Sequence, residues 1–155
     1  MKTMAELTAT HAQEGSIAWI GIRPTRRADV LGVARVAIGP NGLEGDHRAR
    51  PGKRAVTLIQ AEHLPVIASL SGANPSFADL RRNIAVSGIN LAALRGARVR
   101  LGAATLRITG VCAPCSRMEE ILGPGGYNAL RGHGGWTAEV LEAGVVALGD
   151  TVSVL

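Results

Sequence analysis

The sequence predicts a mostly β fold, a largely antiparallel barrel with a few short helices. Glycine occurs 20 times in 155 residues, which favours tight turns between short strands over long helices. Apolar runs of strand length recur along the chain with turn residues between them. The clearest pattern is at residues 98–109, where apolar residues alternate with Arg and Thr on both sides of Gly102-Ala103. Alternation with period two around a two-residue turn indicates a β-hairpin, here with an Arg-rich outer face.

The first half of the chain contains three predicted strands and one predicted helix. Residues 1–15 are polar without a clear period and are interpreted as a loose leader, so the single domain spans residues 16–155. Strands are expected at 16–22, 30–38 and 55–59. The ten residues at 44–53 are polar, and such a loop inside a compact domain is often functional. A helix is expected at 60–70, interrupted by Pro65 and ended by Ser71-Gly72.

Short strands and turns dominate the second half as well. Besides the hairpin, strands are expected at 84–86, 111–115, 136–141, 145–148 and 151–154. Residues 118–122 are typical of a helical turn, and residues 123–135 of a glycine-rich loop. Strand signals therefore recur to the end of the chain and leave little room for long helices.

Composition narrows the class of protein. The length fits one domain, and a hydrophobic content of 46% excludes general disorder. No signal peptide or membrane-spanning run is evident, and two cysteines are too few for a disulfide scaffold. A cytoplasmic protein without membrane contact is therefore expected.

The charge is unevenly distributed. The net charge is +5, and residues 80–118 hold seven Arg and no acidic residue, whereas residues 119–155 hold five acidic residues and one Arg. Arginine binds phosphate or carboxylate as a bidentate fork, so an anion site is one interpretation. An equally good interpretation is that these arginines are solvated on the surface. Nucleic acid is not expected, because only four residues are aromatic and no recognition-helix pattern is present.

The sharpest local motif is the pair Cys112 and Cys115, separated by Ala-Pro. Two thiols at this spacing fit a dithiol redox centre, half of a zinc site, or one reactive thiolate beside an inert cysteine. Zinc would need further ligands, and the four histidines are scattered. Cys112 continues an apolar alternation and fits a buried position. Cys115 lies at a Pro corner beside Arg117, and positive charge favours the thiolate form of a cysteine.

Three weaker motifs accompany the cysteines. In GLEGDH at 42–47, a tight loop would present Asp46 and His47 for ligand positioning or proton transfer, or be a plain solvated turn. In LRRNI at 80–84, an Arg pair and an Asn at the start of a strand would bind an anion or solvate a strand edge. In GHGGW at 132–136, backbone N–H groups would line a pocket or belong to a flexible loop.

Together with CAPCSRME at 112–119 and the LGDTV ending at 148–152, these motifs resemble the MOSC domain family, the molybdenum cofactor sulfurase C-terminal domain. The resemblance covers about residues 16–155 and implies a MOSC-like β-barrel. It implies that Cys115 matches the family's functional cysteine, which in relatives is proposed to carry sulfur or to ligate molybdenum in the pterin cofactor. We accordingly predict Cys115 as catalytic residue and metal ligand, with Asp46 and His47 as further catalytic groups. The predicted cofactor-binding residues are Arg81, Asn83, Arg117, Gly45 and Gly135.

The function implied is molybdenum cofactor binding or sulfur carriage through Cys115. Two alternatives stay open beside it: a molybdenum-dependent reductase of N-hydroxylated compounds, and a non-catalytic cofactor-binding module or dithiol redox protein. The chain shows no fused pyridoxal-phosphate desulfurase, so a separate cysteine desulfurase or an electron-transfer partner is expected. Pyridoxal phosphate would then act only through that partner.

Overall fold

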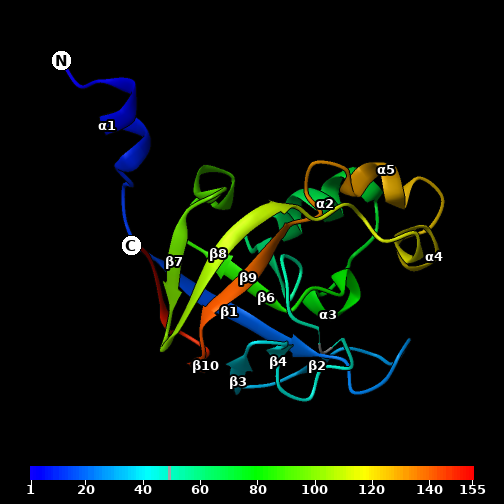
Figure 1. Cartoon of the computed structure of the whole chain (residues 1–155). Coiled ribbons are helices and arrows are strands. Elements are labelled where there is room, and N and C mark those ends of the chain that lie inside the picture. Colours follow the sequence, from blue (N-terminus) through cyan, green and yellow to red (C-terminus); the bar gives the residue numbers. More distant parts are fainter. Residues whose placement is uncertain (49) are drawn as a thin grey trace.

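The computed structural model describes residues 1–48 and 50–155, and Ala49, within the predicted loop at 44–53, lies outside the described residues. Seven strands close into a barrel, in the order β11-β7-β8-β9-β5-β6-β1 and back to β11. The barrel strands are β1 (Gly15–Ile22), β5 (Val56–Gln60), β6 (Ile84–Ser87), β7 (Arg98–Leu101), β8 (Ala104–Val111), β9 (Trp136–Glu142) and β11 (Thr151–Val154). This confirms the predicted mostly β barrel (Figure 1).

The remaining strands extend or flank the barrel. The short β2 (Leu31–Gly32) pairs with the end of β1, at Gly21 and Ile22. A separate small sheet contains β3 (Arg35–Gly39), β4 (Gly42–Leu43) and β10 (Gly144–Ala147). The predicted strand at 30–38 is therefore two strands, which belong to different sheets.

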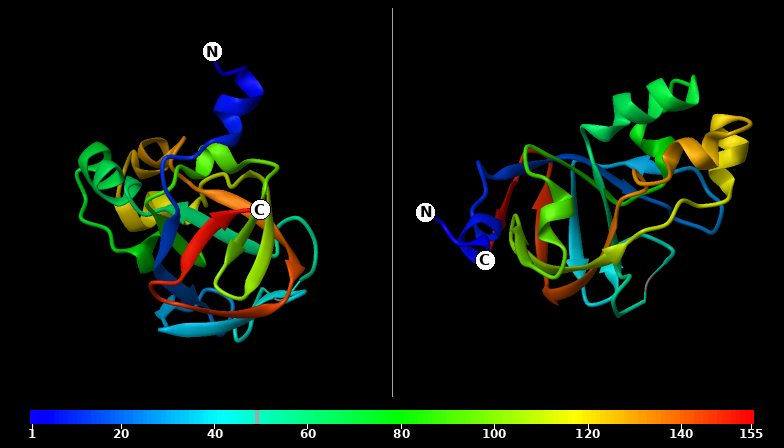
Figure 2. Two further views of the ribbon diagram at one scale, coloured as in Figure 1. Left: turned by 90° about the vertical axis from the view of Figure 1, so that its left-hand side faces the viewer. Right: turned by 90° about the horizontal axis from the view of Figure 1, so that it is seen from above.

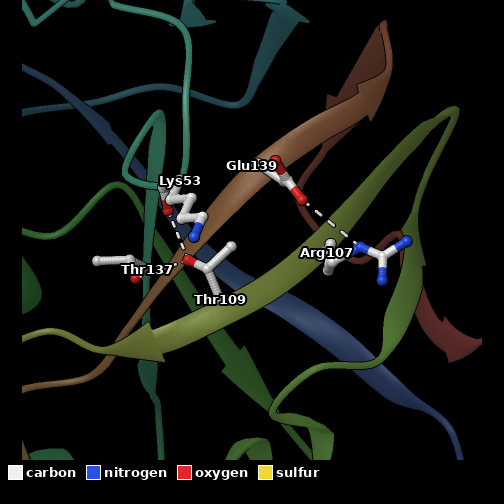
Figure 3. Close-up of polar contacts among 5 residues, drawn as sticks. All are labelled: Lys53, Arg107, Thr109, Thr137 and Glu139. Carbon is white, nitrogen blue, oxygen red and sulfur yellow. Dashed lines mark hydrogen bonds and ion pairs between the residues drawn. The ribbon is translucent and has the colours of Figure 1, made fainter.

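The hairpin at 98–109 forms as predicted. Strand β7 pairs antiparallel with β8 from Arg98 opposite Arg107 to Leu101 opposite Ala104, and Gly102 and Ala103 form the turn. Figure 3 shows polar contacts between β8 and its surroundings. The Thr109 hydroxyl donates to the Lys53 carbonyl oxygen and lies 2.8 Å from the Thr137 hydroxyl, and Arg107 pairs with Glu139 at 3.5 Å. The contact with Lys53 fixes the end of the 44–53 loop on the barrel wall.

Strands β5 and β6 are buried on both faces, which explains their nearly continuous apolar sequences. Leu58 and Ile84 point into the barrel core, whereas Ile59 and Ala85 pack in a second core under the helices. These two strands are parallel, with Leu58 opposite Ile84. Parallel neighbours need a crossover connection, and helix α2 (His63–Ser71) lies in it.

Four of the short helices gather on one side of the barrel, whereas both termini and α1 (Met4–Ala9) lie on the opposite side (Figures 1 and 2). Besides α2, this layer contains α3 (Phe77–Leu80), α4 (Arg117–Leu122) and α5 (Gly126–Leu130). A 3₁₀ helix covers Leu91–Leu94. Helix α2 begins only at His63, so Pro65 falls in its first turn, where the missing N–H has no acceptor within the helix. The predicted interruption at Pro65 is therefore wrong, and the predicted end at Gly72 is confirmed.

Besides α3, two helices form where the sequence predicts none. Helix α1 (Met4–Ala9) lies in the predicted loose leader and has no buried residue. A capping box between Thr3 and Glu6 stabilises its N-terminus, and the sequence contains this signal. Helix α5 divides the predicted loop at 123–135, and its Leu130 is buried against the helical core.

Candidate functional site

Cys115 lies in the segment that links β8 to α4, on the helix side of the barrel. Its side chain is half-buried and lines a cavity of about 570 Å³. Cys112 is 3% exposed, and its backbone N–H donates to the Gly135 carbonyl. Both thiols are free. The predicted contrast between a buried Cys112 and an accessible Cys115 is therefore confirmed.

The cavity beside Cys115 is lined by seven arginines. They are Arg23, Arg26, Arg27, Arg48, Arg50, Arg81 and Arg117, and His47 completes the wall. Among the described residues no carboxylate lines this cavity. Concentrated positive charge in a concave site attracts anions, and the guanidinium fork suits phosphate and carboxylate.

The source of this charge differs from the prediction. Of the seven arginines in the basic stretch at 80–118, only Arg81 and Arg117 line the cavity. The hairpin arginines stand on strands β7 and β8 and do not line it. The other five arginines lie at residues 23–27 and 48–50, which were not predicted to belong to the site. Their signal was the density of Arg in two polar connections.

Arg117 has an unsatisfied donor. Its Nη1 atom is buried and has no hydrogen-bond partner among the described residues. A buried polar group without a partner is costly, and such groups in native structures call for an explanation. Because Arg117 lines the cavity, an anionic oxygen of a bound ligand would supply the missing acceptor.

Arg81 is held in place by its backbone and by one hydrogen bond. It caps helix α3 with a left-handed φ of 58°, and its Nη2 donates to the Ala28 carbonyl at 3.1 Å. Burial lowers the pKa of Arg81, and the positive charges of Arg117 and Arg23 lower it further. The guanidinium groups of Arg117 and Arg23 therefore repel that of Arg81, Cys115 and Asp29 act in the opposite direction, and a bound anion would relieve the repulsion.

Arg82 has a structural role that the sequence reasoning missed. Its Nε donates to the Gly134 carbonyl at 2.7 Å, and its Nη2 to the Ala113 carbonyl at 2.9 Å. Gly134 packs so closely on the cysteine segment that a Cβ there would lie 2.7 Å from the Cys112 carbonyl oxygen. One buried guanidinium thus fastens the segment carrying Cys115 to the loop before β9.

Asn83 and Asp46 form a network beneath an adjoining cavity of about 300 Å³, which shares Arg81 and Cys115 with the first. The Asn83 Oδ1 accepts from the Thr57 N–H at 3.1 Å, and its Nδ2 donates to the Gly21 carbonyl at 3.3 Å and to Asp46 Oδ2 at 3.4 Å. Asp46 Oδ1 accepts from the Arg23 N–H at 2.8 Å. These contacts position the loops around the site. A catalytic role for Asp46 stays a prediction.

The other predicted site residues fall in different places. His47 is exposed on the wall of the large cavity, next to the arginines. Gly45 has a left-handed φ of 85° in the turn before Asp46 and lines neither cavity. Gly135 lines a third cavity of about 160 Å³, together with Cys112 and His133. The structure therefore brings Cys115, His47, Arg81 and Arg117 together and places Gly135 apart from them.

Two histidines contact each other in the third cavity. The Nδ1 atoms of His63, at the start of α2, and of His133 lie 3.2 Å apart. One ring must stay neutral to accept a hydrogen bond, so protonation of both rings would break this contact. Among the described residues, no group of three or more His, Cys, Asp and Glu could hold a metal ion.

The histidine pair predicts loss of stability in mild acid. Burial lowers the pKa of His63 below 6.5, the charge of His133 adds to this, and Glu62 opposes it. The unfolded chain therefore takes up the proton first, so the contribution is present above the unfolded pKa and lost as the pH falls through the lowered folded pKa. Urea unfolding between about pH 7.5 and 5.5 should show a weaker pH dependence in His63→Gln than in the wild type. The variant His11→Gln is the control, and an unchanged dependence in His63→Gln would contradict the prediction.

No helix in the described part of the chain is long and apolar enough to cross a membrane.

Comparisons with known proteins place the chain among MOSC domains. The MOSC domain family matches residues 33–153. The solved structure of YuaD from Bacillus subtilis superposes with a TM-score of 0.82 at 20% identity, over 92% of this chain and 97% of that one. YiiM from Geobacillus stearothermophilus gives 0.75 at 21% identity, over 91% and 75% of the two chains. YiiM from Escherichia coli gives 0.67 at 18% identity, over 90% and 69%. A comparison with curated protein sequences gives no match.

Proposed function

We propose that the chain, which belongs to the MOSC domain family, binds the molybdenum cofactor in the arginine-lined cavity. The MOSC domain family is associated with sulfur or redox chemistry of this cofactor. The Cys115 thiolate would be a ligand of the metal. The observation that carries the proposal is the position of Cys115 on the wall of a 570 Å³ cavity lined by seven arginines. Ligand cavities of about 300–1,000 Å³ are typical for small molecules and cofactors.

The residues present fit the cofactor in two respects. Its phosphate needs fixed positive donors, and Arg81 and Arg117 supply them, the latter with the unpartnered Nη1. Its metal accepts soft ligands, and a thiolate is one. A simple sulfur carrier would need an accessible cysteine but no cavity of this size, so the cavity favours cofactor binding over sulfur carriage alone.

Each group around the site has a definite task in this proposal. When bound, the cofactor supplies a metal centre that changes oxidation state or accepts sulfur. Cys115 would hold the metal, Arg117 and Arg81 would bind and orient the phosphate, and Arg82 would keep the cysteine segment in place. His47 is exposed on the same wall and would exchange protons with solvent at its ring nitrogens.

The alternatives differ in what they need from Cys112 and from a partner. A dithiol redox centre would need both sulfurs to react, and Cys112 is buried beside the Arg82 contacts. A separate electron donor or sulfur donor remains a prediction. Pyridoxal phosphate binds through a lysine, and among the described residues no lysine lines the two adjoining cavities, so that group would act only on a partner.

Metal analysis of the purified protein tests the proposal. Protein made in a molybdenum-replete host should contain stoichiometric molybdenum, and Cys115→Ser should lower that content by at least about tenfold because the metal loses a ligand. The matched control is Cys112→Ala, which should keep its molybdenum. A metal-free wild type with cyanide-labile sulfur on Cys115 would overturn cofactor binding and favour the sulfur carrier. A metal-free wild type whose redox activity is lost in Cys112→Ser, with Cys115 intact, would favour the dithiol.

A further inference from the structure

The cavity arginines form two sets. The inner arginines are Arg23, Arg81 and Arg117, which are buried or half-buried near Cys115. The outer arginines are Arg26, Arg27, Arg48 and Arg50, which are exposed at the mouth of the same cavity. We infer that the outer arginines bind a second phosphate-type anion, so that the ligand occupying this site carries a diphosphate or two separated phosphates. The inference rests on the proposed function in that it assigns the inner arginines to the cofactor's own phosphate.

The outer arginines stand on two segments that are fastened together. One segment links β1 to β2, and the other links β4 to β5. At their bases, the Arg23 N–H donates to Asp46 Oδ1 at 2.8 Å, and the His47 N–H donates to the Arg23 carbonyl at 2.7 Å. The first segment is also tied to the inner set, because Arg81 donates to the Ala28 carbonyl. The two sets are thus parts of one built site.

Among the described residues, no ion pair involves the outer arginines. The ion pair found in the described part of the chain, Arg107–Glu139, lies on strands β8 and β9. Four exposed like charges around one cavity repel each other, and their combined positive potential attracts an anion. Arg27 also holds a left-handed φ of 63°, a conformation that residues with side chains adopt rarely and often near functional sites.

One phosphate does not neutralise the positive charge of all the cavity arginines. A phosphate monoester carries a charge of about −1.5 to −2 near neutral pH. The three inner arginines already exceed that, so a cofactor with one phosphate would leave the outer arginines uncompensated. A second phosphate at the mouth would compensate them, and it would bind bidentately to guanidinium groups.

The site recognises phosphate rather than a nucleobase. None of the four aromatic residues Trp19, Phe77, Tyr127 and Trp136 lines the cavity, so a base has no ring on which to stack. Two sources share the required chemistry: a nucleotide-extended form of the cofactor, and a phosphorylated substrate. In both cases we expect little discrimination between adenine and guanine.

Calorimetric titration with ADP, GDP, AMP and inorganic phosphate tests the inference on the purified protein. ADP and GDP should bind with similar affinity and at least about tenfold more tightly than AMP, a difference of about 1.4 kcal/mol. The double variant Arg26→Gln/Arg27→Gln should lose most of this preference. Arg117→Gln should weaken the binding of all four probes.

The matched control is Arg98→Gln/Arg100→Gln, which removes the same charge from the exposed face of the hairpin. Equal losses in this variant and in Arg26→Gln/Arg27→Gln would show a diffuse charge effect and overturn the inference. So would equal affinity for ADP and phosphate. Failure of the proposed function is detected by a different measurement, the molybdenum content. The wild type would then contain no molybdenum, or Cys115→Ser would contain as much as the wild type.

Two further measurements on molybdenum-loaded protein separate the sources. One nucleoside monophosphate per molybdenum in an acid extract would identify the nucleotide-extended cofactor. No nucleotide in the extract, together with ADP binding by the loaded protein, would identify a phosphorylated substrate. Loaded protein that contains no nucleotide and binds no ADP would overturn the inference.

Discussion

Replacement of Arg82 by glutamine is expected to lower the free energy of unfolding by about 2–4 kcal/mol and to abolish molybdenum loading. Arg82 is 7% exposed and is bonded to the carbonyl oxygens of Gly134 and Ala113. The shorter glutamine side chain cannot span both. The glutamine Nε2 takes the place of the arginine Nε that bonds Gly134, but nothing replaces the Nη2, so the Ala113 carbonyl would lose its partner and the segment bearing Cys115 its attachment.

The charge of Arg82 matters as well as its hydrogen bonds. Burial lowers the pKa of Arg82, and negative charge at Cys112 or Cys115 would act in the opposite direction. The guanidinium and the two cysteines are therefore close enough to interact electrostatically. Arg82→Lys keeps the charge but has one donor nitrogen in place of the two that bond Gly134 and Ala113, so it should fall between the wild type and Arg82→Gln in stability.

Urea unfolding and metal analysis of the same preparations check this prediction. The control is Arg95→Gln, an exposed arginine whose replacement should change stability by no more than about 0.5 kcal/mol. If Arg82→Gln were as stable as Arg95→Gln and kept its molybdenum, the attachment of the two loops would not depend on Arg82.

The barrel was largely predictable because strands leave a local pattern. The hairpin at 98–109 alternates strictly, since one face of each strand is buried and the other is exposed. Strands β5 and β6 were predictable as apolar runs, although the parallel pairing of Leu58 with Ile84 was not. That pairing depends on a crossover through α2, which no local pattern specifies.

The short helices were harder to predict because tertiary packing stabilises them. Helix α3 contributes Leu80 and helix α5 contributes Leu130 to the core under β5 and β6. Helices this short are marginal in isolation. A capping box between Ser76 and Asp79 was the one local signal for α3. Helix α5 has no side-chain cap, so its sequence is indistinguishable from a glycine-rich loop.

The site was predictable at its centre but not at its rim. Cys115, Arg81, Arg117 and His47 do line one cavity. The left-handed backbone at Arg81 decides the different roles of the pair at 81–82. Because of it, Arg81 faces the cavity and Arg82 fastens the loops. Nothing local in LRRNI specifies that conformation. The outer arginines come from segments that approach each other only in the folded chain.

Gly135 illustrates a residue whose importance is steric rather than chemical, and Gly135→Ala is expected to prevent stable folding. Gly135 has a φ of 96°, and a Cβ at this position would overlap the Leu58 carbonyl oxygen of strand β5. The left-handed conformation alone would cost about 1–3 kcal/mol with a side chain. The collision with barrel backbone adds to that cost, so the total should exceed about 4 kcal/mol.

Gly132 provides the matched control for this prediction. It lies in the same loop with a φ of 83°, and a Cβ there would meet nothing within 4 Å. Gly132→Ala should therefore show the conformational cost alone and remain folded, with about 1–3 kcal/mol lost in urea unfolding. Because Gly135 also accepts the hydrogen bond from the Cys112 N–H, its displacement would move the start of the cysteine segment. If Gly135→Ala were as stable as Gly132→Ala, strand β5 would have moved to make room for the methyl group. The close approach of the loop to the barrel would then not hold the cysteine segment in place, which would contradict the prediction.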